Sequence, residues 1–382
     1  MALTSRKFPQ FLNASSMIPL FKHYLQLKDK LPYVSLGEFP TPVEKLEQLG
    51  KDIGINHLFI KRDDLSGKVY GGNKIRKLEF LLSHALRTRV KEVLTFGFAG
   101  SNHALATAIY ARQVGLKSIS MLMPQPNAEY VRRNLLMSNC CGTELHQHRN
   151  VSLLTVGTIY QLLRHKLKYG CFPLIVAAGG SSPLGVTGFV NAAFELKEQI
   201  MEGKIPEPDL IYVALGTTGT SVGLILGLKA LNLKSRIISV RVVDEKFANA
   251  RKMVKLFHKT NSLLHSIDSS FPTLEFSEKD VDIRHDFFGQ QYALFTEEGM
   301  KAVSFMKNCA GIKLDGTYTG KAFASLIDDA EKQDLKKKVV LFWNTYNSKD
   351  FSDILTTVDY HRLPRCFHRY FENEVQPLDR NS

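Results

Sequence analysis

The sequence predicts an α/β fold with open, twisted, mostly parallel sheets and helices on both faces. From residue 57 onward, short apolar runs alternate with amphipathic runs of helical length, and glycine or a small polar residue marks each junction. The chain of 382 residues is 44% hydrophobic, which suffices for a large core and is typical of two domains. In such a fold the active site lies at the carboxyl ends of the strands.

Each expected element corresponds to one of these runs. Strands are expected at residues 58–61, 93–96, 118–123, 174–177, 210–215, 237–242 and 339–342. The clearest helical patterns are at residues 104–114, 129–137, 152–167, 185–199 and 221–231. No internal repeat or low-complexity tract divides the chain.

The composition indicates whether the chain crosses a membrane and in which compartment it is located. No apolar run approaches the ~20 residues that cross a membrane, so no membrane segment is expected. The five cysteines form no C-x-x-C pair and leave one unpaired in any disulfide scheme, which favours a reducing, cytoplasmic location. Residues 1–28 lack Asp and Glu, as transit peptides do, but Pro9 and Pro19 interrupt any helix and favour an N-terminal arm packed on the body.

The formal charge of +13 raises the question of nucleic acid. The basic residues are distributed along the chain, however, and no zinc spacing, basic zipper or aromatic RNA-binding motif accompanies them. We therefore expect small anionic molecules as partners and no nucleic acid.

Lys74 is the leading candidate for chemistry. It follows a Gly-Gly-Asn segment and opens the amphipathic run 75–82. The positive end of the helix dipole disfavours an ammonium at that position, so the amine tends towards its neutral, nucleophilic form. Neutral lysine amines form Schiff bases with carbonyls, and pyridoxal phosphate is the usual biological carbonyl. The alternative is a solvated lysine at an ordinary helix start.

The segment after strand 210–215 is a candidate phosphate site. It comprises Gly216, Thr217, Thr218, Gly219 and Thr220, and an apolar helical pattern follows at once. A glycine-rich turn at a helix N-terminus directs backbone N–H groups at an anion, and the hydroxyls add donors. The spacing matches neither the dinucleotide nor the P-loop motif, which disfavours NAD and ATP. The glycines could instead serve tight packing of helix on strand.

Polar side chains in three other loops are candidates for the same cleft. Ser101, Asn102 and His103 follow strand 93–96, where a histidine could move protons or simply bond backbone groups. Tyr292 and Tyr318 lie in glycine-flanked loops, where tyrosines can serve as acids, bases or positioning groups. Ordinary buried tyrosines are the commoner case.

Six short segments form a recognisable set: KRDDL (61–65), GNK (72–74), RKLE (76–79), GSNH (100–103), TEEGM (296–300) and YTGKA (318–322). Together they resemble the pyridoxal-phosphate enzymes grouped as 1-aminocyclopropane-1-carboxylate deaminases and D-cysteine desulfhydrases. The enzymes of this family have the tryptophan-synthase-β-like fold. The resemblance covers roughly residues 35 to 345.

The resemblance implies a domain organisation. An N-terminal arm at residues 1–34 would precede a large cofactor-binding domain formed by residues 35–76 and 184–382. A smaller domain at residues 77–183 would be inserted into it, with the cofactor in the cleft between them. We also expect a homodimer.

The resemblance also implies residue roles. Lys74 would hold pyridoxal phosphate covalently and act as the base near the substrate Cα. Asn102 would lie near the ring hydroxyl of the cofactor and Ser101 near the substrate carboxylate. Tyr292 and Tyr318 would face a small amino-acid substrate.

Thr319 bears on the reaction type. In the ring-opening deaminases a glutamate follows the second tyrosine and holds the pyridine nitrogen protonated, whereas this chain has Thr319. A hydroxyl cannot stabilise a pyridinium as a carboxylate does. In D-cysteine desulfhydrase-like members a threonine near the last strand meets the ring nitrogen, and Thr345 matches it. We therefore expect β-elimination from D-cysteine, giving pyruvate, hydrogen sulfide and ammonia.

Two departures from the family pattern leave alternatives open. The chain has Leu105-Ala106 where family members usually have Arg-Gln, and Tyr346-Asn347 where they have two glycines. Both changes are expected to touch the pocket. A 1-aminocyclopropane-1-carboxylate deaminase, a serine or threonine dehydratase and a non-catalytic pyridoxal-phosphate-binding protein therefore remain as alternatives.

Overall fold

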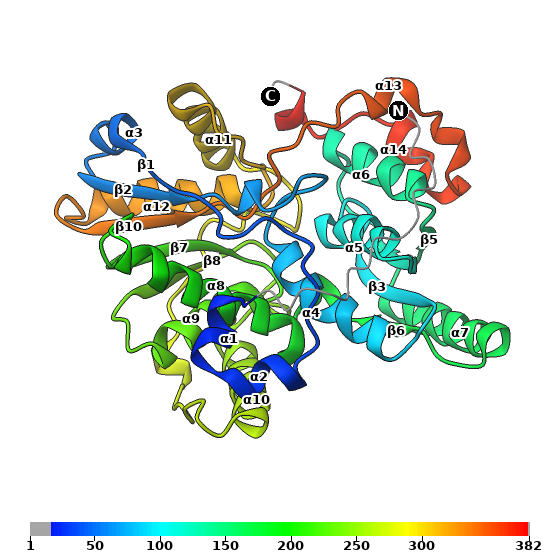
Figure 1. Cartoon of the computed structure of the whole chain (residues 1–382). Helices are drawn as coiled ribbons and strands as arrows, with labels where there is room; N and C mark the ends of the chain where they lie inside the picture. The colour runs from blue at the N-terminus through cyan, green and yellow to red at the C-terminus, as the bar shows by residue number, and fades with distance from the viewer. Residues whose placement is uncertain (1–16, 381–382) are drawn as a thin grey trace.

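The computed structural model describes residues 17–380 and contains two sheets. One has six strands in the order β1-β2-β10-β7-β8-β9, and the other has four in the order β5-β4-β3-β6 (Figure 1). All neighbouring strands are parallel except β1, which pairs antiparallel with β2 at the edge. The predicted α/β class with mostly parallel sheets is confirmed. The strands are β1 (Val43–Lys45), β2 (His57–Lys61), β3 (Glu92–Phe98), β4 (Lys117–Met123), β5 (Glu144–Gln147), β6 (Leu174–Val176), β7 (Leu210–Leu215), β8 (Arg236–Arg241), β9 (Ile283–Arg284) and β10 (Val339–Trp343).

Each predicted strand and helix matches an observed element. The largest boundary shift is in α6, which ends at Cys140 rather than residue 137. The short strands β1, β5 and β9 escaped prediction, because polar residues dominate β1 and β5 and because β9 has only two residues. The helices are α1 (Pro19–His23), α2 (Leu25–Lys30), α3 (Glu47–Asp52), α4 (Lys74–Arg87), α5 (Asn102–Gln113), α6 (Glu129–Cys140), α7 (Val151–Tyr169), α8 (Pro183–Met201), α9 (Gly219–Ala230), α10 (Ala250–Ile267), α11 (Glu297–Ala310), α12 (Thr319–Lys332), α13 (Ile354–Thr357) and α14 (Arg369–Glu372).

Helices cover both faces of the larger sheet (Figure 1). Successive side chains of a strand point to opposite faces, and β10 shows the result. Val340 and Phe342 join the core beneath α11 and α12, whereas Leu341 and Trp343 join the core beneath α8, α9 and α10. Burial on both faces explains why the central strands read as continuous apolar runs.

The smaller sheet lies beside the larger one, with α4 between them in Figure 1. It is built from residues 92–176. Val93 and Val176 face the core shared with α4 and α5, whereas Leu94 and Ile119 pack on the other face, where Leu154 of α7 joins them. The domain boundaries at residues 77 and 183 stay a prediction, and limited proteolysis would test them.

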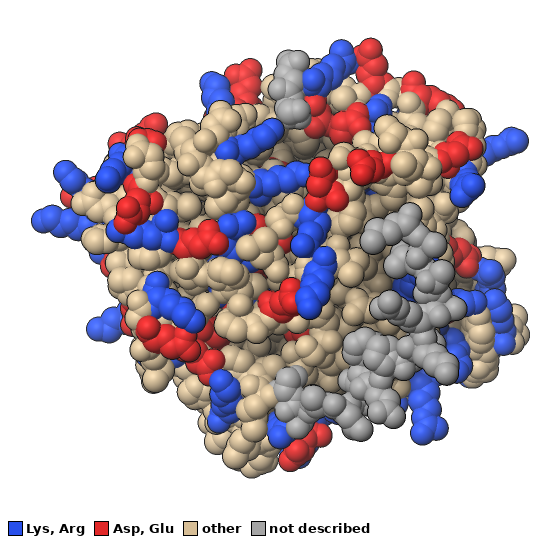
Figure 2. All heavy atoms as spheres, turned by 45° about the horizontal axis from the view of Figure 1, so that its top comes forward, with Lys and Arg blue, Asp and Glu red and all other residues tan. Residues whose placement is uncertain are grey.

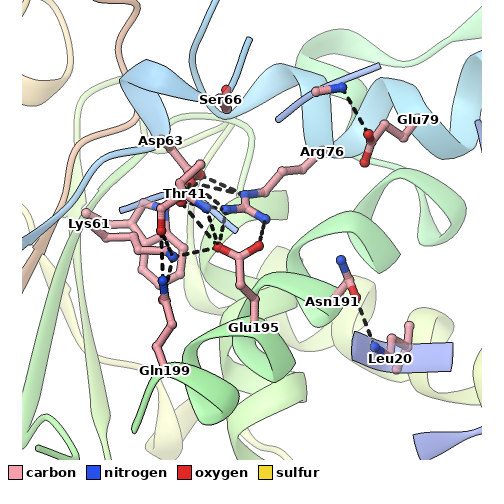
Figure 3. A network of polar contacts seen from close by, with 12 residues as sticks. Leu20, Thr41, Lys61, Asp63, Ser66, Arg76, Glu79, Asn191, Glu195 and Gln199 are labelled. Carbon is pink, nitrogen blue, oxygen red and sulfur yellow. Dashed lines mark hydrogen bonds and ion pairs between the residues drawn. The ribbon is translucent and has the colours of Figure 1, made fainter. Parts of the chain in front are cut away.

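The described part of the N-terminal segment packs on the body. Leu20, Phe21 and Leu27 of α1 and α2 are buried in the core that includes α8 and α10. The Leu20 amide donates to Asn191 Oδ1 at 3.0 Å (Figure 3). Residues 1–16, including Pro9, lie outside the described part of the chain. Within residues 17–380, no helix is long and apolar enough to cross a membrane.

Charged side chains of both signs are interspersed on the face shown in Figure 2. Many basic groups pair locally: Arg284 contacts Asp286 and Asp328, and Lys338 contacts Asp209. An exposed pair such as that of Lys338 with Asp209 contributes little to stability, typically below about 1 kcal/mol.

A buried polar cluster fixes α4 against β2 and α8 (Figure 3). Arg76 lies 2.7 Å from Asp63 Oδ1 and 2.9 Å from Glu195 Oε2, and Lys61 lies 2.5 Å from Glu195 Oε1. Burial by itself raises the pKa of Glu195, but Arg76 and Lys61 outweigh it and hold the pKa at about 2. The cluster thus fixes the helix that begins with Lys74.

We expect Glu195→Ala to lower the free energy of unfolding by about 3–5 kcal/mol, because it leaves two buried cations without their shared carboxylate. Urea unfolding would measure the loss. The control is Glu198→Ala on the same helix, whose half-exposed pair with Lys22 should be worth less than about 1 kcal/mol. Since folding depresses the Glu195 pKa from 4.5 to about 2, its contribution is present above pH 4.5 and disappears as the pH falls towards 2. Equal losses in the two variants would contradict this account.

Candidate active site

A cavity of about 310 Å³ opens at the carboxyl ends of β3, β7 and β10, lined by residues of both sheets and their loops. Every residue singled out from the sequence for catalysis or cofactor binding lines it. They are Lys74, Ser101, Asn102, Gly216, Thr217, Thr218, Gly219, Thr220, Tyr292, Tyr318 and Thr345. The location agrees with the rule for parallel α/β sheets.

Lys74 is the first residue of α4, as the sequence predicts. Burial lowers its pKa to about 8, and the negative charge of Asp315 opposes the shift. Loss of solvation in the cavity thus acts in the same direction as the helix dipole that the sequence argument named.

The loop before Lys74 is held by the end of β10. Gly72 has φ +95°, and a Cβ there would lie 2.9 Å from the carbonyl oxygen of Tyr346. The Asn73 amide donates to the Thr345 carbonyl at 3.2 Å, and the Gly71 amide donates to Asn347 Oδ1 at 2.7 Å. Asn347, one of the departures from the family pattern, therefore fastens the loop that presents Lys74.

Tyr346 also lines the cavity, and its hydroxyl accepts a hydrogen bond from Arg133 at 3.1 Å. The expectation that both departures touch the pocket is correct for Tyr346 and Asn347 but wrong for Leu105 and Ala106. Those two are fully buried in the core beneath α4 and α5. Because α5 begins at Asn102, they lie one turn into the helix, on its inward face.

The segment from Gly216 to Thr220 forms a cradle at the N-terminus of α9. Thr218 caps the helix in the left-handed region at φ +66°. A Cβ on Gly219 would lie 2.5 Å from Ser181 Oγ and 2.8 Å from Lys77 Nζ, so only glycine leaves the space open. Backbone donors at a helix start and an adjacent amine suit a phosphate.

Lys77 is a residue that the sequence argument missed. It is buried, lines the cavity, and donates to the Gly179 carbonyl at 3.1 Å and to Ser181 Oγ at 3.3 Å. Burial and the neighbouring Lys74 lower its pKa well below the usual value. A buried amine whose described partners are neutral oxygens fits a phosphate, which would restore its charge. Its position three residues after Lys74, on the same helix face, was the available signal.

Asn102 and Ser101 occupy the start of α5. Asn102 Oδ1 accepts from Asn134 at 2.9 Å and from the Tyr70 hydroxyl at 3.3 Å, which leaves the Asn102 amide group as a donor. Ser101 caps α5 by accepting from the Ala104 amide at 3.2 Å. Its hydroxyl hydrogen is then free to bind a carboxylate.

The two tyrosines meet in the cavity, with their hydroxyl oxygens 2.5 Å apart. Burial raises the pKa of both phenols, so both are protonated at neutral pH. Backbone amides at the start of α12, including that of Tyr318, donate to the Asp315 carboxylate, and burial raises the pKa of Asp315 to about 6. Lys321 donates to the carbonyls of residues 288 and 294 at 2.7 Å each, which fixes the loop of Tyr292.

Thr319 lies outside the cavity wall, whereas Thr345 and His103 form part of it. Thr319 is fully buried, and its hydroxyl accepts from the Asp315 amide at 2.9 Å, so it is occupied in the turn and is not part of the cavity wall. Thr345 does line the cavity. His103 lines it too, and burial with the nearby Lys74 lowers its pKa well below the usual value, so its ring is neutral.

Comparison with known proteins identifies the family to which the chain belongs. Residues 34–345 match the family described as pyridoxal-phosphate dependent enzyme. The chain belongs to this family. Its cofactor is therefore pyridoxal phosphate, as the resemblance implied.

Relatives and solved structures agree with the match. The chain is 34% identical to a putative 1-aminocyclopropane-1-carboxylate deaminase of Pyrococcus horikoshii, over 81% of this chain and 90% of that protein. It is 33% identical to the D-cysteine desulfhydrase of Klebsiella pneumoniae, over 84% of this chain and 95% of that protein. A crystal structure of a 1-aminocyclopropane-1-carboxylate deaminase homologue superposes with a TM-score of 0.72 at 31% identity, covering 87% of this chain and 98% of that one.

A more distant structure shares the fold. Threonine deaminase isoform 2 of Solanum lycopersicum aligns with a TM-score of 0.58 at 15% identity, over 88% of this chain and 87% of that one. The predicted resemblance and fold type are thus confirmed.

Proposed function

We propose that the protein is a cytoplasmic, homodimeric pyridoxal-phosphate lyase that eliminates the β-thiol of a small amino acid, with D-cysteine as the leading substrate. One observation carries the proposal. A partly neutral lysine, a phosphate cradle and a pair of protonated tyrosines converge on one cavity, whose wall includes the neutral hydroxyl of Thr345.

The residues present fit the cofactor. Lys74 would hold it covalently, the backbone from Gly216 to Thr220 and the amine of Lys77 would bind its phosphate, and Asn102 would donate to its ring hydroxyl. Thr345 would meet the ring nitrogen. When bound, the cofactor supplies the electron withdrawal that makes the substrate Cα proton acidic.

Side chains of the protein then carry out the separate steps of the reaction. Ser101 binds the substrate carboxylate, and the Lys74 amine removes the Cα proton. The tyrosine pair, protonated because burial raises both pKa values, donates a proton to the departing thiolate. The aminoacrylate released is hydrolysed by water to pyruvate and ammonia. The proton that Lys74 took from Cα passes to the tyrosine pair through solvent, so that both groups are regenerated.

Relative rates on two substrates would test the reaction type. We expect sulfide release from D-cysteine and little ammonia from 1-aminocyclopropane-1-carboxylate, because each pKa unit lost at the ring nitrogen costs about 1.4 kcal/mol of the charged form, about tenfold in rate. Thr345→Glu, at a position that lines the cavity, should shift the kcat/KM ratio towards the cyclopropane. Thr345→Ser keeps a hydroxyl at the same position and is the matched control. A wild-type preference for the cyclopropane would overturn this argument.

The non-catalytic alternative has a distinct signature. A pyridoxal-phosphate carrier would bind the cofactor on Lys74 and release neither pyruvate nor ammonia from a panel of D- and L-amino acids. That result would refute the proposed lyase while leaving the cofactor in place.

A further inference from the structure

We propose that the substrate carries an apolar group on its β-sulfur, so that the protein eliminates S-alkyl or S-aryl cysteines in preference to cysteine itself. The inference rests on the proposed elimination and names the substrate class of the same site. It comes from apolar residues of the cavity lining to which no catalytic or cofactor-binding role is assigned.

One wall of the cavity is apolar and comes from both sheets. On the small sheet's side it is formed at the ends of β3 and β4 and at the start of α7, and on the other side by the segment after β8. The side chains that form it are Phe98, Met123, Val151, Leu154, Val243 and Phe247.

These apolar side chains include one beside the reacting groups and two at exposed positions. The rings of Phe98 and Tyr292 lie 4.4 Å apart between centroids, and Tyr292 is hydrogen-bonded to Tyr318. At the other end, Val151 is 62% exposed and Phe247 is 37% exposed. A β-substituent that leaves past the tyrosine pair therefore meets apolar side chains from the reacting centre outward.

Few charged side chains line the cavity. Among the described lining residues the only ones of Lys, Arg, Asp or Glu type are Lys74, Lys77 and Asp315. Lys77 lies at the cradle, and Asp315 is bonded to backbone amides. The apolar wall therefore provides no counter-charge for a second carboxylate or amine. With a free thiol on the substrate, these apolar side chains would stay in contact with water. An alkyl or aryl group on the sulfur would cover them.

The elimination balances for such a substrate. The Cα–H bond is broken by the lysine amine, and the Cβ–S bond breaks with its electron pair leaving on sulfur. The thiolate takes a proton and departs as R–SH. Water then converts the aminoacrylate to pyruvate and ammonium, so one thioether amino acid and one water give one thiol, one pyruvate and one ammonium.

Binding of unreactive analogues tests the wall without any turnover. Straight-chain 2-aminoalkanoates from 2-aminobutyrate to 2-aminoheptanoate, in both chiral forms, have no β-leaving group. Titration calorimetry on the holoenzyme should show affinity for one enantiomer rising about fourfold for each added methylene. Affinity that stays flat or falls with chain length would overturn the inference.

Turnover measurements on the wild-type protein and on variants provide a second test. kcat/KM for thiol release should rise from S-methyl to S-butyl cysteine and exceed that for sulfide from cysteine of the same chirality. Leu154→Ala and Phe247→Ala should flatten both series, whereas Phe172→Ala, which changes an exposed ring outside the cavity, should leave their slopes unchanged. Sulfide release without a chain-length effect would refute the preference for an apolar β-substituent and leave the proposed lyase in place. Chain-length-dependent binding without release of any thiol would support the wall and refute the proposed lyase.

Discussion

Lys74→Ala is expected to abolish covalent attachment of pyridoxal phosphate and to lower kcat/KM for elimination by about 10³-fold or more, since one amine both holds the cofactor and removes the Cα proton. Borohydride reduction of the wild-type holoenzyme, followed by peptide mapping, should place the pyridoxyl group on Lys74. Lys68→Ala is the matched control, because its side chain is 81% exposed and lies outside the cavity. A pyridoxyl group on Lys61, Lys68 or Lys77 would refute the assignment.

The pKa of Lys74 gives this prediction a pH dependence. An amine must be neutral to attack the cofactor's aldehyde, and a pKa of about 8 leaves roughly a tenth of it neutral at pH 7. The rate of cofactor attachment to the apoprotein should therefore rise with pH and level off above about pH 8. A rate that is independent of pH between 6 and 9 would show that another group controls attachment.

Gly219→Asp is expected to reduce cofactor affinity by at least about 100-fold while the protein stays folded. The new side chain would point at Ser181 Oγ and Lys77 Nζ, which a Cβ at this position approaches at 2.5 and 2.8 Å. Its carboxylate would occupy the space of the phosphate, pair with Lys77 and repel the cofactor's dianion. Equilibrium dialysis would measure the affinity, and thermal unfolding of the apoprotein would report the fold.

Gly219→Ala separates bulk from charge at the same position. It adds the Cβ without a carboxylate, so its loss of affinity should be clearly smaller than that of the aspartate variant. Normal cofactor content in Gly219→Asp would place the phosphate elsewhere in the cavity.

The sequence alone predicted the central strands, several helices and a set of candidate site residues that line one cavity. The period of apolar residues gave the strands and helices, because burial on both faces of a parallel sheet selects continuous apolar runs. The Asn-Lys helix start, the glycine-threonine loop and the two tyrosines were recognisable because each depends on a local backbone geometry that the neighbouring residues specify.

The tertiary structure alone decided what depends on contacts between distant segments. It brought Tyr292 and Tyr318 to 2.5 Å from each other and placed Lys77 beside Gly219. It also lowered the pKa of Lys74 through burial. Solvation and the distances between side chains are set by the packing of two sheets around one cavity, and no local pattern in a single chain encodes them.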